Sequence, residues 1–180
     1  MKLEYRDCNL ILRQLNETSA EQVLDFYYSN REYFDVYETE KPSNFYTLEY
    51  IKKLLNSEYN AFVQGKYVRF FAYDIARPKE IIGTVSFSDL RRGNMMSCII
   101  GYKVGHKHQR QGYGYRMLNA ALKAMVIDGQ MHRIEAYIAP DNMPSVGLVK
   151  KLGFISEGTA YSYIRNRGIW NDMLRYVYIS

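Results

Sequence analysis

The sequence has few of the residues that cross-link a protein or hold a metal. Its only two cysteines, Cys8 and Cys98, are too few for a framework of disulfides. The three histidines have no cysteine or acidic residue beside them at the spacing of a metal site. We therefore expect a reduced protein without a metal ion.

Long apolar runs and linkers are also missing. No apolar stretch approaches the roughly 20 residues of a membrane-spanning helix, and the amino terminus, MKLEYRDCNLILRQL, carries charges too early for a signal peptide. No repeat or low-complexity tract divides the chain, which is long enough to bury roughly two-thirds of its unfolded surface in one core. We expect one domain over residues 1–180, located in the cytoplasm.

Acidic residues are outnumbered by basic ones, 19 to 24, which gives a formal net charge of +5. This excess favours an anionic partner such as nucleic acid, a membrane surface or a phosphate-bearing cofactor. The basic residues are scattered, and the 18 tyrosines lack the regular spacing typical of stacked bases. Charge alone does not choose among these partners.

The hydrophobic pattern predicts an α+β protein. Helical spacing is found at 20–30, 47–59, 112–129 and 141–153, and strand-like runs at 9–15, 61–65, 68–75, 80–90, 95–104, 132–139, 154–166 and 169–179. The runs from 61 to 104 suit an antiparallel meander, and the strand–helix–strand order from 95 to 139 suits one β-α-β unit.

The segment HKHQRQGYGYRML, residues 106–118, lies where a predicted strand gives way to a predicted helix. The first backbone N–H groups of a helix have no internal partner and the dipole there is positive, so a phosphate is bound well at that end. Gly112 and Gly114 would let an anion approach without a Cβ in the way. Positive charge comes from Lys107, His108, Arg110 and Arg116. The other interpretation is an ordinary turn with a solvated basic rim.

Two other phosphate-binding motifs are excluded at this loop. A dinucleotide fingerprint needs a glycine at position 117, where the chain has Met117. A P-loop needs Gly-Lys followed by Ser or Thr, and no such sequence follows the glycines.

Several motifs together resemble the GNAT superfamily of N-acetyltransferases, and within it the Rim-type acetyltransferases of ribosomal-protein amino termini. The Q/R-x-x-G-x-G/A signature of the family appears as QRQGYG at 109–114, and its N-x-x-S helix start as NMPS at 142–145. LGF at 152–154, EG at 157–158 and GIWND at 168–172 follow in the expected order. The resemblance rests on motifs over residues 80–180, and on element order alone before them.

The resemblance implies a mixed, mostly antiparallel sheet flanked by helices, and acetyl-CoA as the donor. Its pyrophosphate would bind the amides of residues 110–115, and its pantetheine arm would follow the strand GYKV. The implied cofactor residues are Tyr102, Val104, Gln109, Arg110, Gln111, Gly112, Tyr113, Gly114, Tyr115 and Asn142.

The catalytic candidates are Ser145 and Glu135. The resemblance implies that Ser145 protonates the leaving thiolate, although a serine there also suits a helix start, as Asn142 suits an N-cap. Some relatives use a tyrosine seven positions after this asparagine, where Val149 excludes that role. Glu135, on the strand that leads to Asn142, is the candidate general base acting through water, and the alternative is a surface glutamate. A backbone N–H near Val104 is the expected oxyanion donor.

Acceptor recognition is expected in two variable segments, residues 31–46 and 161–168. Tyr33, Tyr37 and Tyr161 are the candidate contacts. The expected acceptor is a protein or peptide amino terminus, such as that of a ribosomal protein. Two alternatives stay open: transfer to a small amine such as a polyamine or aminoglycoside, and a CoA-binding sensor without turnover. Direct binding of nucleic acid or membrane is not expected, and the chain would be a monomer or homodimer.

Overall fold

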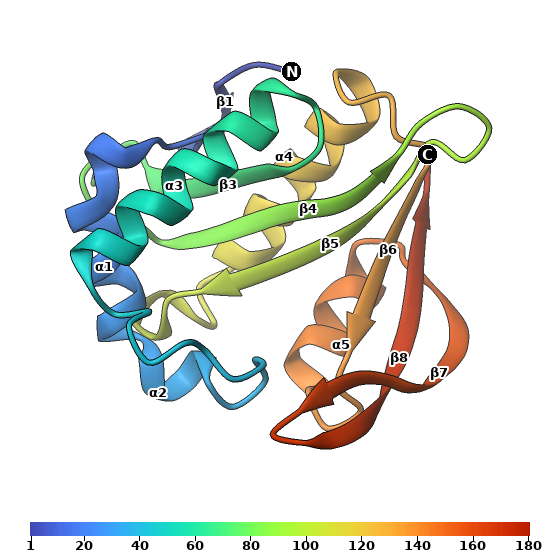
Figure 1. The fold of residues 1–180 in the computed structure, drawn as a ribbon. Helices are drawn as coiled ribbons and strands as arrows, with labels where there is room; N and C mark the ends of the chain where they lie inside the picture. Colours follow the sequence, from blue (N-terminus) through green and yellow to red (C-terminus); the bar gives the residue numbers. More distant parts are fainter.

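An eight-stranded sheet with helices on both faces forms the computed structural model, which describes residues 1–180 (Figure 1). The strands are β1 (Glu4–Asp7), β2 (Leu10–Arg13), β3 (Val68–Asp74), β4 (Gly83–Arg91), β5 (Ser97–Val104), β6 (Arg133–Ile138), β7 (Ile155–Asn166) and β8 (Ile169–Ile179). The helices are α1 (Ala20–Ser29), α2 (Arg31–Phe34), α3 (Leu48–Val63), α4 (Tyr113–Ile127) and α5 (Met143–Lys151), with 3-10 turns η1 (Glu17–Ser19) and η2 (His106–His108).

The strand order across the sheet is β1-β2-β3-β4-β5-β6-β8-β7. Every neighbouring pair is antiparallel except β5 and β6, which are parallel and are joined by α4. A parallel pair needs such a crossover because a tight hairpin cannot join its ends. The predicted α+β class, the mostly antiparallel sheet and the β-α-β unit are therefore confirmed. None of the helices is both long and apolar enough to cross a membrane.

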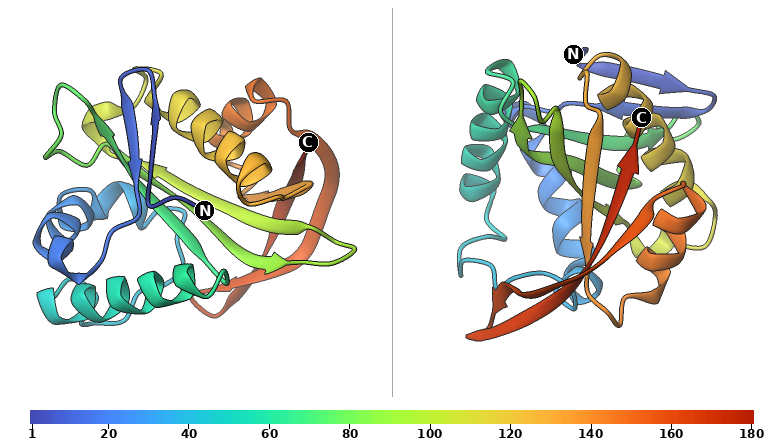
Figure 2. Two further views of the ribbon diagram at one scale, coloured as in Figure 1. Left: turned by 90° about the horizontal axis from the view of Figure 1, so that it is seen from above. Right: turned by 90° about the vertical axis from the view of Figure 1, so that its right-hand side faces the viewer.

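Two hydrophobic cores lie on opposite faces of the sheet. Successive side chains of a strand point to opposite faces, so Phe70 and Ala72 of β3 pack in the core shared with α4 and α5, while Phe71 and Tyr73 pack with α1 and α3. Figure 2 shows α1 and α3 on one side of the sheet and α4 and α5 on the other. Each large apolar side chain buried in this way contributes roughly 1.5–3 kcal/mol.

The predicted strand at 61–65 is wrong, because α3 continues to Val63. Ile51, Leu55, Glu58 and Phe62 are spaced by four, three and four residues, which places them on one face of a helix. The first three are buried and Phe62 packs against the core, so the helical face extends four residues beyond its predicted end.

Strand β1 was not predicted. It pairs with β2 in a short hairpin whose turn places Cys8 at φ 54°, a left-handed conformation that glycine or asparagine usually signals in a sequence. Tyr5 of β1 then packs edge-on against Phe70, with their ring centroids 5.4 Å apart. The hairpin covers the edge of the sheet that the predicted strand at 9–15 would have formed.

Candidate active site

Strands β5 and β6 are paired over only three residues. Ser97, Cys98 and Ile99 lie opposite Arg133, Ile134 and Glu135, after which β5 continues to Val104 paired with β4 alone. The strands diverge beyond this point, as Figure 1 shows. The separation thus begins after Ile99, well before Val104, near which the oxyanion donor is expected.

The divergence leaves backbone groups of β5 without a strand partner. The Gly105 N–H donates to the Ile82 carbonyl at 2.8 Å, and the Gly101 carbonyl accepts from Ser86 Oγ at 3.4 Å, so the odd-numbered residues direct their backbone groups toward β4. Because these directions alternate along a strand, the N–H groups of Tyr102 and Val104 face the diverging side. These are the residues predicted to bind the pantetheine arm.

The loop between β5 and α4 presents a row of free amides. None of the backbone N–H groups of residues 110–115 donates a hydrogen bond within the chain. Arg110 and Gly112 have φ of 60° and 78°, left-handed conformations that turn the loop into the start of α4. Consecutive amides in such a turn at a helix N-terminus form an anion-binding concavity. The loop therefore fits a pyrophosphate group.

The two glycines of this loop have different roles. A Cβ on Gly112 would meet no protein atom within 4 Å, so open space lies beside this residue. A Cβ on Gly114 would lie 3.2 Å from Leu148 Cδ2 and 3.5 Å from Val104 Cγ2. Gly114 thus lets α4 approach α5 and β5 closely, whereas Gly112 supplies the turn and keeps its outer side open.

Tyr113 supports the loop from inside the protein. Its side chain is buried, and its hydroxyl donates to Asp74 Oδ2 at 2.8 Å while accepting from Arg77 Nη2 at 3.0 Å. Hydrogen bonds from the Ala76 N–H and from Tyr113 lower the pKa of Asp74. Only the backbone of Tyr113 remains available to a cofactor.

Side chains of the predicted signature also hold the loop. Gln109 Nε2 donates to the Val104 carbonyl at 3.3 Å, and Gln111 Nε2 donates to the Lys107 carbonyl at 2.7 Å. Tyr115 lies farther along, with Lys151 Nζ 5.0 Å from its ring centroid. The glutamines thus order the main chain, whose amides are the groups exposed to a ligand.

The N-terminus of α5 lies beside β5. Asn142 Oδ1 accepts from the Ser145 N–H at 3.2 Å, so Asn142 is the N-cap. The Tyr102 hydroxyl donates to the Ser145 carbonyl at 3.4 Å, and burial raises the pKa of Tyr102 to about 12. The Ser145 hydroxyl itself makes no hydrogen bond within the chain. Ser145 is thus held beside Tyr102 of β5.

Glu135 faces away from α4 and α5. Its carboxylate accepts from Arg133 Nε at 2.8 Å and from the Tyr137 hydroxyl at 2.7 Å. Burial raises the pKa of Glu135, but the bonds from Arg133 and Tyr137 outweigh it, so the pKa lies below its ordinary value. The Tyr137 ring stacks on Tyr163 of β7, with centroids 4.0 Å apart. Glu135 is therefore a fixed and ionised carboxylate.

The three tyrosines predicted to contact the acceptor are not gathered in one cluster. Tyr33 stacks on His106 at 3.7 Å between ring centroids, next to the amide loop. Tyr161 lies on β7 and is 80% exposed, and Tyr37 is also exposed. No aromatic contact joins the three side chains.

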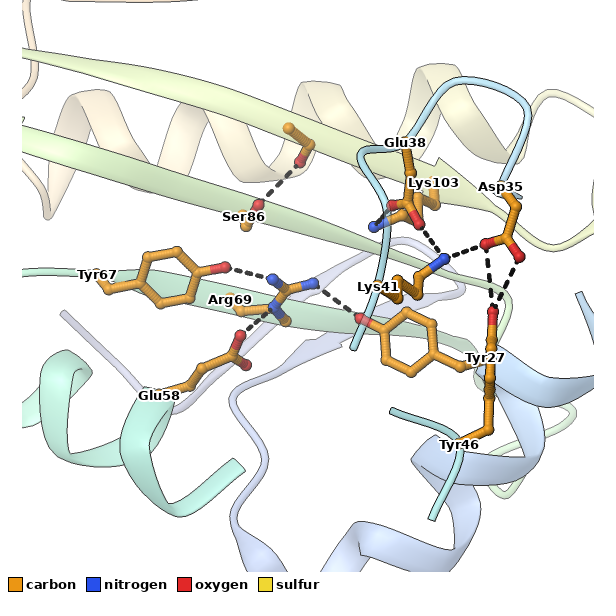
Figure 3. Close-up of polar contacts among 11 residues, drawn as sticks. Tyr27, Asp35, Glu38, Lys41, Tyr46, Glu58, Tyr67, Arg69, Ser86 and Lys103 are labelled. Atoms are coloured by element: carbon orange, nitrogen blue, oxygen red, sulfur yellow. Dashed lines mark hydrogen bonds and ion pairs between the residues drawn. The ribbon is translucent and has the colours of Figure 1, made fainter. Parts of the chain in front are cut away.

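A network of charged residues that the sequence pattern did not indicate lies on the same face as Glu135 (Figure 3). Glu38 pairs with both Lys103 of β5 and Lys41, and Lys41 also pairs with Asp35, which accepts a bond from Tyr46. Burial lowers the pKa of the Lys103 amine, which the Asp35 carboxylate opposes. An adjacent cavity of about 460 Å³ is lined by Asp35, Glu38, Thr39, Glu40, Lys41, Pro42, Ser43, Tyr46 and Arg167.

A second buried ion pair lies between β3 and α3 on the same face of the sheet. Arg69 of β3 lies 2.9 Å from Glu58 of α3 and donates to the Tyr27 hydroxyl at 2.9 Å (Figure 3). Burial raises the pKa of Glu58, which Arg69 opposes. This pair joins α1 and α3 to the sheet.

The sheet that opens between β5 and β6, with free amides at the start of α4, is the architecture of an acetyltransferase. The chain belongs to the GNAT family: the acetyltransferase (GNAT) domain model matches residues 9–155. It is an N-acetyltransferase that uses acetyl-CoA.

Among its relatives, the [ribosomal protein uS5]-alanine N-acetyltransferase of Escherichia coli is 33% identical over 91% of this chain and 84% of its own. The crystal structure of ribosomal-protein-S5-alanine acetyltransferase from Vibrio fischeri is 25% identical and has a TM-score of 0.91 over 99% of this chain and 97% of its own. The structure of Mycobacterium smegmatis RimJ in complex with CoA-disulfide has the same fold, with 21% identity and a TM-score of 0.88 over 95% of this chain and 82% of its own.

Proposed function

We propose that this N-acetyltransferase acetylates the α-amine of a protein or peptide amino terminus. The observation that carries the proposal is the similarity, over nearly the whole chain, to an enzyme named for acetylating an alanine of a ribosomal protein. We extend that acceptor class to this chain, with an amino-terminal alanine as the first acceptor to test.

The donor site consists of the free amides and the unpaired edge of β5. The amides of residues 110–115 would bind the pyrophosphate, and the backbone N–H groups of Tyr102 and Val104 would hold the pantetheine arm. Asn142 fixes the start of α5 beside them. When bound, acetyl-CoA supplies an activated acetyl thioester.

Three groups of the chain perform the transfer. A backbone N–H near Val104 stabilises the oxyanion, because it faces the diverging side of β5 without a strand partner. The Ser145 hydroxyl, free of other hydrogen bonds in the chain, would donate a proton to the leaving thiolate and regain one from water. Glu135 accepts the proton of the attacking amine through a water molecule.

The basicity of Glu135 supports an α-amine over a lysine. A carboxylate whose pKa is lowered by Arg133 and Tyr137 is a weak base. An α-amine has a pKa of about 7.7–8.0, so about a tenth of it is already neutral at pH 7, whereas a lysine with a pKa of about 10.4 is almost fully charged. A weak base is therefore sufficient for an amino terminus and poorly suited to a lysine side chain.

A panel of acceptors tests the proposal. Release of free thiol from acetyl-CoA is measured with a peptide that begins with alanine, and mass spectrometry locates the acetyl group. The matched control is the same peptide with a blocked amino terminus and one internal lysine. We expect turnover of the first peptide only. Turnover of a polyamine or an aminoglycoside without any of the peptide would refute the proposal, as would CoA binding without turnover of any amine.

A further inference from the structure

Glu38 is the residue at which the α2–α3 connection, β5 and the β7–β8 hairpin meet. It lies in the connection between α2 and α3, which has no regular structure from residue 39 to 42. Its carboxylate pairs with Lys103 of β5 and lies 2.7 Å from Lys41 Nζ. Its backbone carbonyl accepts from Asn166 Nδ2, at the end of β7, at 3.1 Å. One residue thus links this connection to β5 and to the β7–β8 hairpin; Figure 3 shows its contacts with Lys103 and Lys41.

The Lys103 side chain is enclosed where it meets Glu38. It is 23% exposed, and its amine lies 5.7 Å from the Tyr27 ring centroid and 5.9 Å from that of Phe34. An enclosed ammonium group requires a carboxylate, because the rings supply only part of the solvation that water would give. Glu38 is the carboxylate in direct contact with Lys103. The pair is therefore a stronger constraint than an ordinary surface salt bridge.

The position of Lys103 in β5 connects this pair to the reaction. Its neighbours Tyr102 and Val104 present their backbone amides to the diverging side of the strand, while the Lys103 side chain leaves on the face opposite to α4 and α5. Glu38 is consequently fixed beside the strand that holds the donor. Its bond to Asn166 also joins residues 31–46 to residues 161–168, the two segments predicted to recognise the acceptor.

We propose that Lys103, acting through Glu38, is a positioning residue for the amine acceptor. The pair fixes residues 35–46 on the face of the sheet that carries Glu135, and thereby sets the affinity for the acceptor. The inference rests on the proposed function, in which the amine approaches from the face of Glu135. Neither residue takes part in proton transfer.

Variants that remove one charge at nearly constant size test the pair. Lys103→Met keeps a long apolar stem between Tyr27 and Phe34, and Glu38→Gln keeps the shape of the partner. Lys53→Met is the matched control, because it breaks the exposed pair with Glu49, 2.6 Å long, on α3.

Amide hydrogen exchange of the full chain without ligand is the first measurement. We expect Lys103→Met and Glu38→Gln to raise exchange about tenfold in residues 35–46 and 163–168, and to leave residues 106–116 unchanged. Lys53→Met should change none of these segments. Unchanged exchange in 35–46 overturns the proposal even if the acceptor class assigned above is wrong.

Steady-state kinetics with acetyl-CoA and the alanine peptide is the second measurement. We expect KM for the peptide to rise about tenfold in each variant, with kcat and the Kd of CoA within about twofold of the unmodified protein. The double variant should match the single variants, since the residues act as one unit. An equal loss of kcat and CoA affinity indicates a merely structural role and overturns the proposal. If the unmodified protein turns over a polyamine instead of the peptide, the proposed acceptor is wrong and the same KM comparison is made with the polyamine.

Discussion

Replacement of Gly112 by valine is expected to weaken CoA binding far more than an equally strained replacement elsewhere. Gly112 has φ 78° and Gly93, in the connection between β4 and β5, has φ 67°. A Cβ at either position would meet no protein atom within 4 Å. A left-handed conformation costs a residue with a Cβ roughly 1–2 kcal/mol, which lowers Tm by about 2–8 °C in a chain of this size. Gly112→Val and Gly93→Val should therefore lose similar stability.

Their effects on the cofactor should differ because only Gly112 lies among the free amides of residues 110–115. We expect a valine side chain there to obstruct an anion at those amides, and each hydrogen bond to a charged group contributes about 1.5–3 kcal/mol. Loss of one or two such bonds raises Kd by about 100-fold. Calorimetric titration with CoA measures Kd, and thermal unfolding measures the fall in Tm that the backbone strain causes. Equal Kd values for the two variants, at equal losses of Tm, would show that this loop does not bind the pyrophosphate.

Three other outcomes follow from the site. Ser145→Ala should lower kcat by about 100-fold or more with the Kd of CoA unchanged, as steady-state kinetics and titration will show; an unaltered kcat assigns the proton to another donor. Tyr113→Phe should cost about 1–3 kcal/mol in urea unfolding, since it removes a hydrogen bond from the buried carboxylate of Asp74; equal midpoints contradict that role. The side-chain bond from Arg133 lowers the folded-state pKa of Glu157 below 4.5, so its stabilisation is present above that pH and is lost as the pH falls. Between pH 6 and pH 3, the Tm of Arg133→Met should therefore fall less than the Tm of the unmodified protein. An equal fall in the two proteins would contradict the stabilisation of Glu157 by Arg133.

Those parts of the fold that depend on contiguous residues were predictable. The helix after Gly112 and the helix capped by Asn142 follow from apolar spacing and capping chemistry within one segment, and both are present at the predicted positions. Errors arose where local signals were ambiguous. Residues 61–65 read as a strand because the apolar run is short, whereas packing of Phe62 against the core continues the helix. The turn at Cys8 and Asn9 contains an asparagine, but the left-handed position is occupied by Cys8, a residue type that does not signal a turn.

The candidate site likewise has one part that contiguous residues determine and another that depends on residues far apart in the sequence. The amide loop is encoded by the order of residues 106–118, so its form could be inferred from that segment alone. The pair of Glu38 and Lys103 joins positions 65 residues apart, and nothing in the sequence distinguishes these two from other charged residues. The point at which β5 leaves β6 was also beyond prediction, because the register of a parallel pair depends on how α4 packs between the strands.

In the proposed function, the alternation of side chains along β5 lets a single strand serve both substrates. Tyr102 points toward α5, where its hydroxyl reaches the Ser145 carbonyl, while Lys103 points to the opposite face and meets Glu38. Neighbouring residues would thus contact the donor side and the acceptor side from different faces, although they share the same backbone. A change at either side chain can therefore alter the recognition of one substrate without displacing the other. A change that shifts the strand itself, such as a bulge introduced between Tyr102 and Val104, would move both substrates and should abolish transfer even if each is still bound.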